Sequence, residues 1–202
     1  MKKWRWPILL TVIFVGLGAL LHREELRLID RSVGDFFYGL RTDGLTPLVK
    51  GVSELGSTTG FVVVLLITLV WTLLYLRNVR YAVWLTVSLA GGWLLNKALK
   101  ALYSRERPDL WDHLVVPDGY SFPSRNAMIS AAFFGLIALL LLRSGKAGKR
   151  IWAAVVLLII LLIGVSRLYF GVHYASDIVG GFLAGAVVAV LCSWGALRRN
   201  NR

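Results

Sequence analysis

Residues 165–181 read VSRLYFGVHYASDIVGG, which places serine, arginine, histidine and aspartate at the end of a long apolar run. His173 and Asp177 are four residues apart, so on a helix they share a face, and the carboxylate can hold the imidazole by one ring nitrogen. Arg167 precedes His173 by six residues, and a short turn between them could bring its guanidinium over the same spot. A planar cation beside an oriented imidazole suits a phosphate or a carboxylate ligand.

The composition is typical of a membrane protein. Of the 202 residues, 57% are hydrophobic, 17% are charged and 8 are tryptophan, which lies outside the range of soluble proteins. The formal net charge of +12 could indicate nucleic-acid binding, but the placement of the charges argues against a nucleic-acid partner. The single cysteine, Cys192, lies in an apolar run, which excludes a disulfide framework and a cysteine-based metal site. We therefore expect one membrane-embedded domain over residues 1–202.

Apolar segments separated by charged residues predict an all-α bundle of six transmembrane helices. They are expected at residues 7–21, 60–76, 81–95, 127–142, 151–165 and 178–197, and the third continues to residue 103. We expect the first to be retained as a transmembrane helix and not cleaved as a signal peptide. Between the first two spans, the spacing of Leu26, Ile29, Val33 and Phe36 predicts an amphipathic helix near residues 26–40. Such a helix would lie along the membrane interface, and a solvated loop is the alternative.

The charges of the connecting segments predict which side of the membrane each one faces. One set of segments holds 12 cations and no carboxylate, and the other holds the remaining 11 of 23 cations and all 11 carboxylates. The positive-inside rule makes the first set cytoplasmic. We therefore expect a plasma-membrane protein with both termini in the cytoplasm. Residues 22–57, 104–122 and 167–177 would lie on the outer face. The cytoplasmic cations are Lys2, Lys3, Arg5, Arg77, Arg80, Arg143, Lys146, Lys149, Arg150, Arg198, Arg199 and Arg202.

Three segments reach the predicted outer face together. In Lys100-x6-Arg107, seven residues make about two helical turns, so the two cations align if the helix extends that far before the next proline ends it. Ser124 is placed as the N-cap of the fourth span, and the backbone N–H groups after it form a ready anion site. With Arg125 and Arg167, these segments offer four cations near a helix N-terminus at the membrane surface.

Other charged residues near this face have a simpler interpretation. Lys97, Arg105 and Arg23 are expected to reach lipid headgroups, as most cations near helix ends do. His113 stands among several aspartates, but the spacing matches no metal-ligand pattern. We therefore expect a solvated loop there, without a metal site or a cofactor.

Three ordered motifs resemble the signature of the type 2 phosphatidic acid phosphatase family, the integral-membrane lipid phosphatases. They are Lys100-x6-Arg107-Pro108, Pro123-Ser124, and Ser166-Arg167-x5-His173-x3-Asp177. The first and third match in full, and the resemblance runs from about residue 30 to residue 191. The resemblance implies a metal-independent membrane phosphatase that acts on a phosphorylated lipid, and we infer no required protein partner.

The resemblance also implies roles for the motif residues. His173 would be the nucleophile that forms a phosphohistidine, and Asp177 would orient it and stabilise its charge. Phosphoryl transfer depends on positioning and charge neutralisation more than on covalent help. The phosphoryl oxygens would be held by Lys100, Arg107, Arg167 and Ser124.

The middle motif departs from the family pattern. The family's motif ends Pro-Ser-Gly-His, whereas this chain has Arg125 and Asn126 in the last two positions. The missing histidine is the family's general acid, and general acid catalysis is typically worth about 10²- to 10⁴-fold. Asn126 can donate a hydrogen bond but not a proton, while Arg125 adds a cation to the phosphate site.

This departure bears on the substrate. A phosphomonoester such as phosphatidate expels an alkoxide, and the pKa of its parent alcohol is near that of water, about 15.7, so the leaving group needs a proton. A lipid diphosphate expels a phosphate monoester whose pKa is about 6. We therefore expect diphosphates such as undecaprenyl diphosphate to be preferred over phosphatidate or phosphatidylglycerol phosphate. One alternative is that another proton donor, with Tyr120, His113 and water as candidates, replaces the missing histidine. A second alternative is a catalytically impaired protein that binds or transports phosphorylated lipids on the same scaffold.

Overall fold

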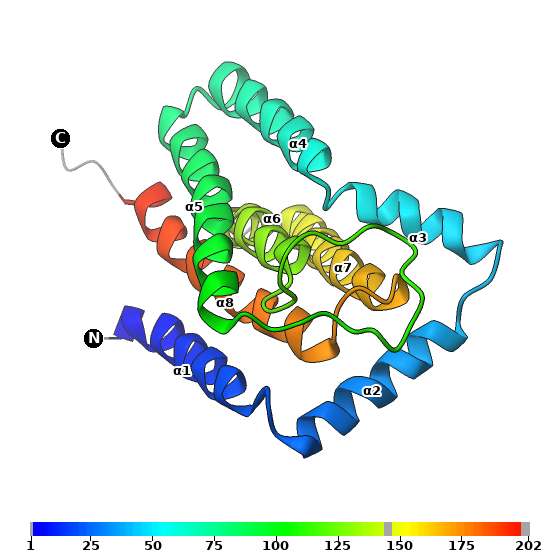
Figure 1. Cartoon of the computed structure of the whole chain (residues 1–202). Coiled ribbons are helices and arrows are strands. Elements are labelled where there is room, and N and C mark those ends of the chain that lie inside the picture. The colour runs from blue at the N-terminus through cyan, green and yellow to red at the C-terminus, as the bar shows by residue number, and fades with distance from the viewer. Residues whose placement is uncertain (1, 144–146, 199–202) are drawn as a thin grey trace.

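The computed structural model describes residues 2–143 and 147–198, and every regular element in these ranges is helical (Figure 1). The elements are η1 (Lys2–Trp4), α1 (Arg5–Leu20), α2 (Glu24–Gly39), α3 (Leu45–Glu54), α4 (Thr58–Val70), η2 (Trp71–Tyr75), α5 (Val79–Tyr103), α6 (Arg125–Arg143), α7 (Ala147–Tyr169) and α8 (Ala175–Ala196). The predicted all-α class is confirmed. Three of the cations predicted to be cytoplasmic lie outside the described residues: Lys146, Arg199 and Arg202.

The centre of the bundle is α6, with α5, α7 and α8 packed around it (Figure 1). Its sequence is apolar on nearly all sides, which is typical of a helix covered by its neighbours. The main core joins Phe133 and Leu136 of α6 to Leu85 of α5 and Ile163 of α7. This packing holds the N-terminal end of α6 beside that of α8, where the backbone N–H of Ser124 donates to a carbonyl at the start of α8.

Four helical segments among the described residues are long and apolar enough to cross a membrane: Thr58–Tyr75, Arg125–Arg143, Ala147–Tyr169 and Ala175–Ala196. A fifth is added if α1 and α2, which are bent by 96°, count as one span. The 25 residues of α5 extend about 37 Å, but they include Arg80, Lys97 and Lys100 and are less apolar. The chain is thus a membrane protein with four or five candidate spans, and the six-helix count stays a prediction.

A sharp bend after α1 turns α2 along the edge of the bundle (Figure 1). Asp30 and Gly34 of α2 are buried, whereas Leu28, Ile29 and Phe36 are exposed. A helix is therefore present where the amphipathic pattern predicts one, and its place at the membrane interface stays a prediction. A second helix, α3, packs against α7 and was not predicted from the sequence.

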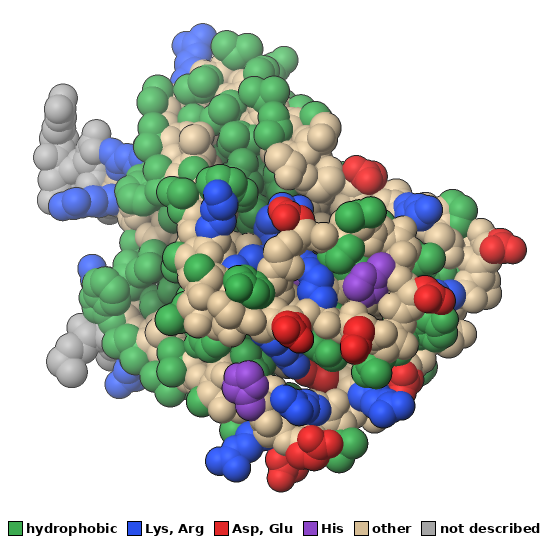
Figure 2. All heavy atoms as spheres, in the orientation of Figure 1, with side chains coloured by type: hydrophobic (Ala, Val, Ile, Leu, Met, Phe, Trp, Pro, Cys, Tyr) green, Lys and Arg blue, Asp and Glu red, His purple; other side chains and the backbone are tan. Residues whose placement is uncertain are grey.

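The 104–124 segment between α5 and α6 is an irregular loop that passes over the ends of other helices (Figure 1). Leu114 N donates to Phe170 O at 3.1 Å, which joins the loop to the α7–α8 turn. Trp111 Nε1 donates to Asp35 Oδ1 at 2.8 Å, which joins it to α2. Figure 2 shows acidic and basic side chains gathered over this loop and over α2 and α3, with hydrophobic side chains covering α4 and α5. The loop and the α7–α8 turn thus form the polar end of the bundle.

Candidate active site

A cavity of about 320 Å³ at this polar end gathers most of the predicted site residues. They come from α5, the α5–α6 loop, the first turn of α6, the end of α7 and the α7–α8 turn. The predicted residues that line the cavity are Lys100, Arg107, Arg125, Asn126, Arg167 and His173. Asp177 and Ser124, the other two, are fully buried. The fold therefore surrounds one imidazole with the four predicted cations.

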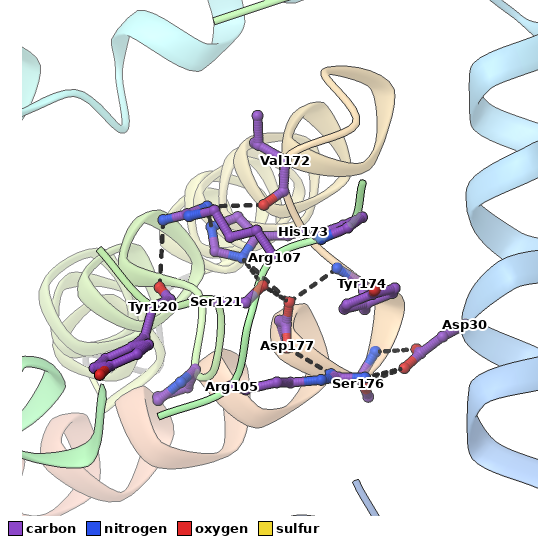
Figure 3. A network of polar contacts seen from close by, with 12 residues as sticks. Asp30, Arg105, Arg107, Tyr120, Ser121, Val172, His173, Tyr174, Ser176 and Asp177 are labelled. Atoms are coloured by element: carbon purple, nitrogen blue, oxygen red, sulfur yellow. Dashed lines mark hydrogen bonds and ion pairs between the residues drawn. The ribbon is translucent and has the colours of Figure 1, made fainter. Parts of the chain in front are cut away.

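His173 contacts Asp177 as predicted, but not along one helix face, because His173 lies in the turn before α8 and Asp177 in the first turn of α8. The His173 Nδ1 atom lies 3.3 Å from Asp177 Oδ2 and 3.3 Å from Ser121 Oγ (Figure 3). Ser121 Oγ also donates to Asp177 Oδ2, and the Tyr174 backbone N–H donates to the same oxygen at 2.9 Å. These contacts fix the carboxylate against the imidazole at the first turn of α8.

The other ring nitrogen of His173 faces a donor. Arg107 Nη1 lies 3.2 Å from His173 Nε2, and because a guanidinium has donors only, Nε2 must be the acceptor. The ring proton is therefore on Nδ1, toward Asp177, and Nε2 carries the lone pair. Burial holds the pKa of His173 well below its ordinary value, although Asp177 acts in the opposite direction. The imidazole is thus neutral at physiological pH, which is the nucleophilic form.

Lys100 and Arg107 meet by a different route from the one predicted. The expected alignment along one helix is wrong, because α5 ends at Tyr103 and the next residue adopts a left-handed conformation. The loop instead turns back, so that Lys100 Nζ and Arg107 Nη2 both donate to the Tyr120 carbonyl. Arg107 also donates to the carbonyls of Gly119, Asp118 and Val172 at 2.7 to 2.8 Å. A phosphate that binds Arg107 must therefore compete with backbone carbonyl oxygens.

Two buried polar atoms near the cavity lack a hydrogen-bond partner among the described residues: Ser124 Oγ and Arg167 Nε. Ser124 directly precedes α6, as the predicted N-cap does, but its hydroxyl makes no capping bond there. Arg167 is tethered from α3, since its Nη1 donates to Ser53 Oγ at 3.2 Å. Unpaired buried polar groups are costly, and phosphoryl oxygens are suitable partners for both atoms.

The prediction that Arg105 reaches lipid headgroups is wrong. Arg105 forms ion pairs with Asp177 at 2.7 Å and with Asp30 at 2.8 Å, and it is almost fully buried. Burial would lower the pKa of Arg105, but the two carboxylates more than offset it and the pKa is raised. For Lys97 the structure gives a Trp93 ring contact at 4.7 Å.

Sequence reasoning missed Ser121 and Asp30 as members of the site. Asp30 carried a usable signal, because helical spacing puts it on the same face as Leu26, Val33 and Phe37, the face that packs on the bundle. A carboxylate on a buried face needs a partner. For Ser121 the sequence held no such signal beyond its place next to the middle motif.

The His113 side chain lies with Nε2 at 2.8 Å from the Pro108 carbonyl oxygen. No group of three or more potential metal ligands occurs among the described residues.

Comparison with known proteins assigns the family. Residues 81–201, which include all three motifs, match the model of the PAP2 superfamily. The chain belongs to the PAP2 superfamily. This PAP2 protein is 28% identical over 189 residues to phosphatidylglycerophosphatase B of Bacillus subtilis (strain 168), with 92% of each chain covered.

Solved structures support the same family over nearly the whole chain. The crystal structure of the first transmembrane PAP2-type phosphatidylglycerolphosphate phosphatase from Bacillus subtilis superposes on this PAP2 protein with a TM-score of 0.89 and 26% identity, covering 98% of this chain and 99% of that chain. The Aquifex aeolicus LpxE structure has a TM-score of 0.62 and 22% identity, covering 83% of this chain and 94% of that chain, and shares the fold. The family resemblance expected from the three motifs is confirmed.

Proposed function

We propose that this PAP2 protein removes the terminal phosphate from a lipid diphosphate such as undecaprenyl diphosphate, through a phosphohistidine at His173. The observation that carries the proposal is the orientation of His173. Its Nδ1 is held against Asp177, and its Nε2 carries a lone pair beside Arg107 in a cavity lined by cations. An oriented, neutral nucleophile in an anion-binding cavity suits phosphoryl transfer.

The reaction takes two steps. In the first, the Nε2 lone pair of His173 forms a bond to the terminal phosphorus, and the bridging P–O bond breaks, its electron pair leaving with the lipid monophosphate. The imidazole becomes cationic, and the Asp177 carboxylate neutralises it through Nδ1–H. In the second, a water oxygen attacks the phosphorus, one water proton stays on that oxygen while the other passes to a phosphoryl oxygen, and the N–P bond breaks, so that its electron pair returns to Nε2 and dihydrogen phosphate leaves. Lys100, Arg107 and Arg167 neutralise the phosphoryl oxygens in both steps.

Asn126 is the reason for proposing a diphosphate. It stands in the first turn of α6 and lines the cavity with His173, where the family has its acid histidine. An amide supplies no proton to a departing alkoxide, whereas a lipid monophosphate leaves from a diphosphate without one. Arg125, the neighbouring departure, lines the same cavity and adds a charge that a second phosphate can use.

The site is proposed to face the outside of the cell. Arg77, Arg80 and Arg198 line a different groove, and the described residues that line it include neither a carboxylate nor His173. A carboxylate-free cluster of arginines at one end of a membrane protein is typical of its cytoplasmic side. The lipid chain would then remain in the outer leaflet while its phosphates enter the cavity laterally.

The test is phosphate release in detergent with EDTA present, from undecaprenyl diphosphate, phosphatidate and phosphatidylglycerol phosphate in parallel. The last is included because the Bacillus subtilis relatives are named for it. We expect release from the diphosphate to exceed release from both monoesters, and His173→Ala to abolish it. Comparable turnover of phosphatidate and undecaprenyl diphosphate would contradict the substrate proposal, and an active His173→Ala variant would contradict the mechanism.

A second candidate function is binding or transport of phosphorylated lipids without turnover. The observation in its favour is Asn126, which removes the family's proton donor from an otherwise cationic cavity. Under this alternative the protein binds undecaprenyl diphosphate but releases no phosphate, and Asn126→His restores turnover. The buried His173 and Asp177 pair argues for the enzyme, because binding alone needs no oriented nucleophile.

A further inference from the structure

A buried charge cluster holds Asp177 on the side opposite its contact with His173. Arg105 Nη1 donates to Asp177 Oδ1 at 2.7 Å, and Arg105 Nη2 donates to Asp30 Oδ2 at 2.8 Å (Figure 3). Arg105 does not line the cavity that contains His173. It lines a separate groove of about 660 Å³ between α2 and the start of the α5–α6 loop. Arg105 is therefore placed to act on Asp177 and not on the phosphate.

The cluster also joins α2 to the start of α8. Asp30 Oδ1 accepts from the backbone N–H of Ser176 at 2.8 Å, and Asp30 Oδ2 accepts from Ser176 Oγ at 2.6 Å. Arg105 Nη1 donates to Ser176 Oγ as well, at 2.7 Å. Ser176 is the residue before Asp177, so one carboxylate from α2 fixes the backbone turn that carries Asp177. The guanidinium bridges the two carboxylates in a way that a lysine ammonium cannot reproduce.

We propose that Arg105 and Asp30 are positioning residues for phosphoryl transfer: Arg105 keeps the buried Asp177 carboxylate ionised and in line with His173 Nδ1, and Asp30 holds Arg105 and the start of α8 in register. This inference rests on the phosphohistidine function proposed above. It assigns a role to two residues that are not among the predicted site residues: Arg105, which occupies a variable position of the first motif, and Asp30, which precedes all three motifs.

Arg105 matters for catalysis because the charge of Asp177 decides which ring nitrogen of His173 carries the proton. The groups that face Asp177 are Arg105, His173, Tyr174 and Ser121, and the only full positive charge in direct contact with it is Arg105 among the described residues. Lys100 and Arg107 act on it from farther away. A fully buried carboxylate without a cation favours its protonated form. A protonated Asp177 would donate to Nδ1 and move the ring proton to Nε2, which removes the lone pair that attacks phosphorus.

The experiment compares Arg105→Gln, Arg105→Lys and Asp30→Asn with the wild type and His173→Ala, using undecaprenyl diphosphate in detergent. The readout is kcat as a function of pH, with folded yield and thermal unfolding measured for each variant. Arg31→Gln on α2 is the matched control, because Arg31 is exposed and its ion pair, with Asp35 at 3.8 Å, is exposed as well.

The three variants have distinct expected results. Arg105→Gln lowers kcat near neutral pH by about 10- to 100-fold and moves the acid limb of the profile to higher pH by about one unit or more. Arg105→Lys lowers kcat but moves the acid limb less, because the charge remains. Asp30→Asn lowers kcat without moving the limb upward, because it removes a negative charge near Asp177. Arg31→Gln behaves as the wild type.

The outcomes separate this inference from the proposed function. A wild type that releases no phosphate overturns the proposed function, and this inference falls with it. An active wild type together with an Arg105→Gln variant whose pH profile is unchanged per folded molecule overturns only the positioning role, and Arg105 is then a structural ion pair. An equal shift in Arg105→Lys and Arg105→Gln also contradicts it, because the charge would not be the cause.

Discussion

The close approach of α8 to α6 gives a sharp test of how packing supports the site. A Cβ atom added at Gly181 of α8 would lie 2.8 Å from the Ser124 carbonyl oxygen, 2.9 Å from Ala127 Cβ and 3.0 Å from Met128 N. Two of these three atoms belong to the backbone at the start of α6, which cannot rotate out of the way. We therefore expect Gly181→Ala to destabilise the protein and to impair catalysis.

The magnitude follows from the required displacement. Ordinary van der Waals contact begins near 3.4 Å, so the start of α6 must move away by about half an ångström, and overpacking of this kind costs about 1–3 kcal/mol. The same backbone donates from Ser124 N to Asp177 O at 3.0 Å and carries Asn126 into the cavity. Because misplacement by about 1 Å can cost about 10²-fold in rate, we expect kcat to fall by about tenfold.

The assay is thermal unfolding in detergent together with phosphate release. Two glycines provide graded controls: a Cβ at Gly91 meets nothing within 4 Å, and one at Gly135 lies 3.3 Å from the Ala189 methyl group. We expect Gly91→Ala to be neutral or stabilising, since alanine favours the helix by about 0.5–1 kcal/mol, and Gly135→Ala to be intermediate. A Gly181→Ala protein as stable and active as Gly91→Ala would refute the reasoning, because the two helices would then not be in tight backbone contact.

Three further predictions concern the chemistry. Burial holds the pKa of His173 below its ordinary value, so the stability that depends on a neutral ring is complete above pH of about 6.5 and is lost as pH falls below it. The difference in melting temperature between wild type and His173→Gln should therefore change between about pH 8 and pH 5. A difference that stays constant over this range would contradict the prediction. Asn126→His should raise phosphatidate turnover by about 10²- to 10⁴-fold with a smaller effect on undecaprenyl diphosphate, and an equal effect on both substrates in the release assay would contradict the leaving-group argument. EDTA should leave phosphate release unchanged, because side-chain cations neutralise the phosphoryl oxygens; activity that is lost with EDTA and restored by added Mg²⁺ would contradict this.

Local patterns in the sequence predicted a large part of the fold and the site. The apolar runs located α6, α7 and α8 within a few residues of their observed bounds, because a helix surrounded by lipid or by other helices must be apolar over its whole length. The short spacing of His173 and Asp177 predicted their contact, but the two residues do not share a helix face, because His173 lies in the turn before α8 and Asp177 in the first turn of α8.

Other features were predicted with the wrong geometry. Lys100 and Arg107 do converge, but through a loop that turns back on Tyr120 and not along one helix. The left-handed residue Ser104 ends α5 early, and serine gives no strong signal for that conformation. The turn is held by backbone carbonyls, which every residue carries and no sequence pattern reveals.

The sequence by itself determined that this chain is an all-α membrane protein of the PAP2 superfamily and named six of the residues that line its cationic cavity, because apolar runs and short motifs are local properties. Only the tertiary structure decided that Arg105 pairs with Asp30, which is 75 positions away, and with Asp177. A cation near a helix end looks the same in sequence whether it reaches lipid headgroups or is buried between two carboxylates. Its partners are fixed by how α2 packs against the start of α8, and no local spacing records that packing.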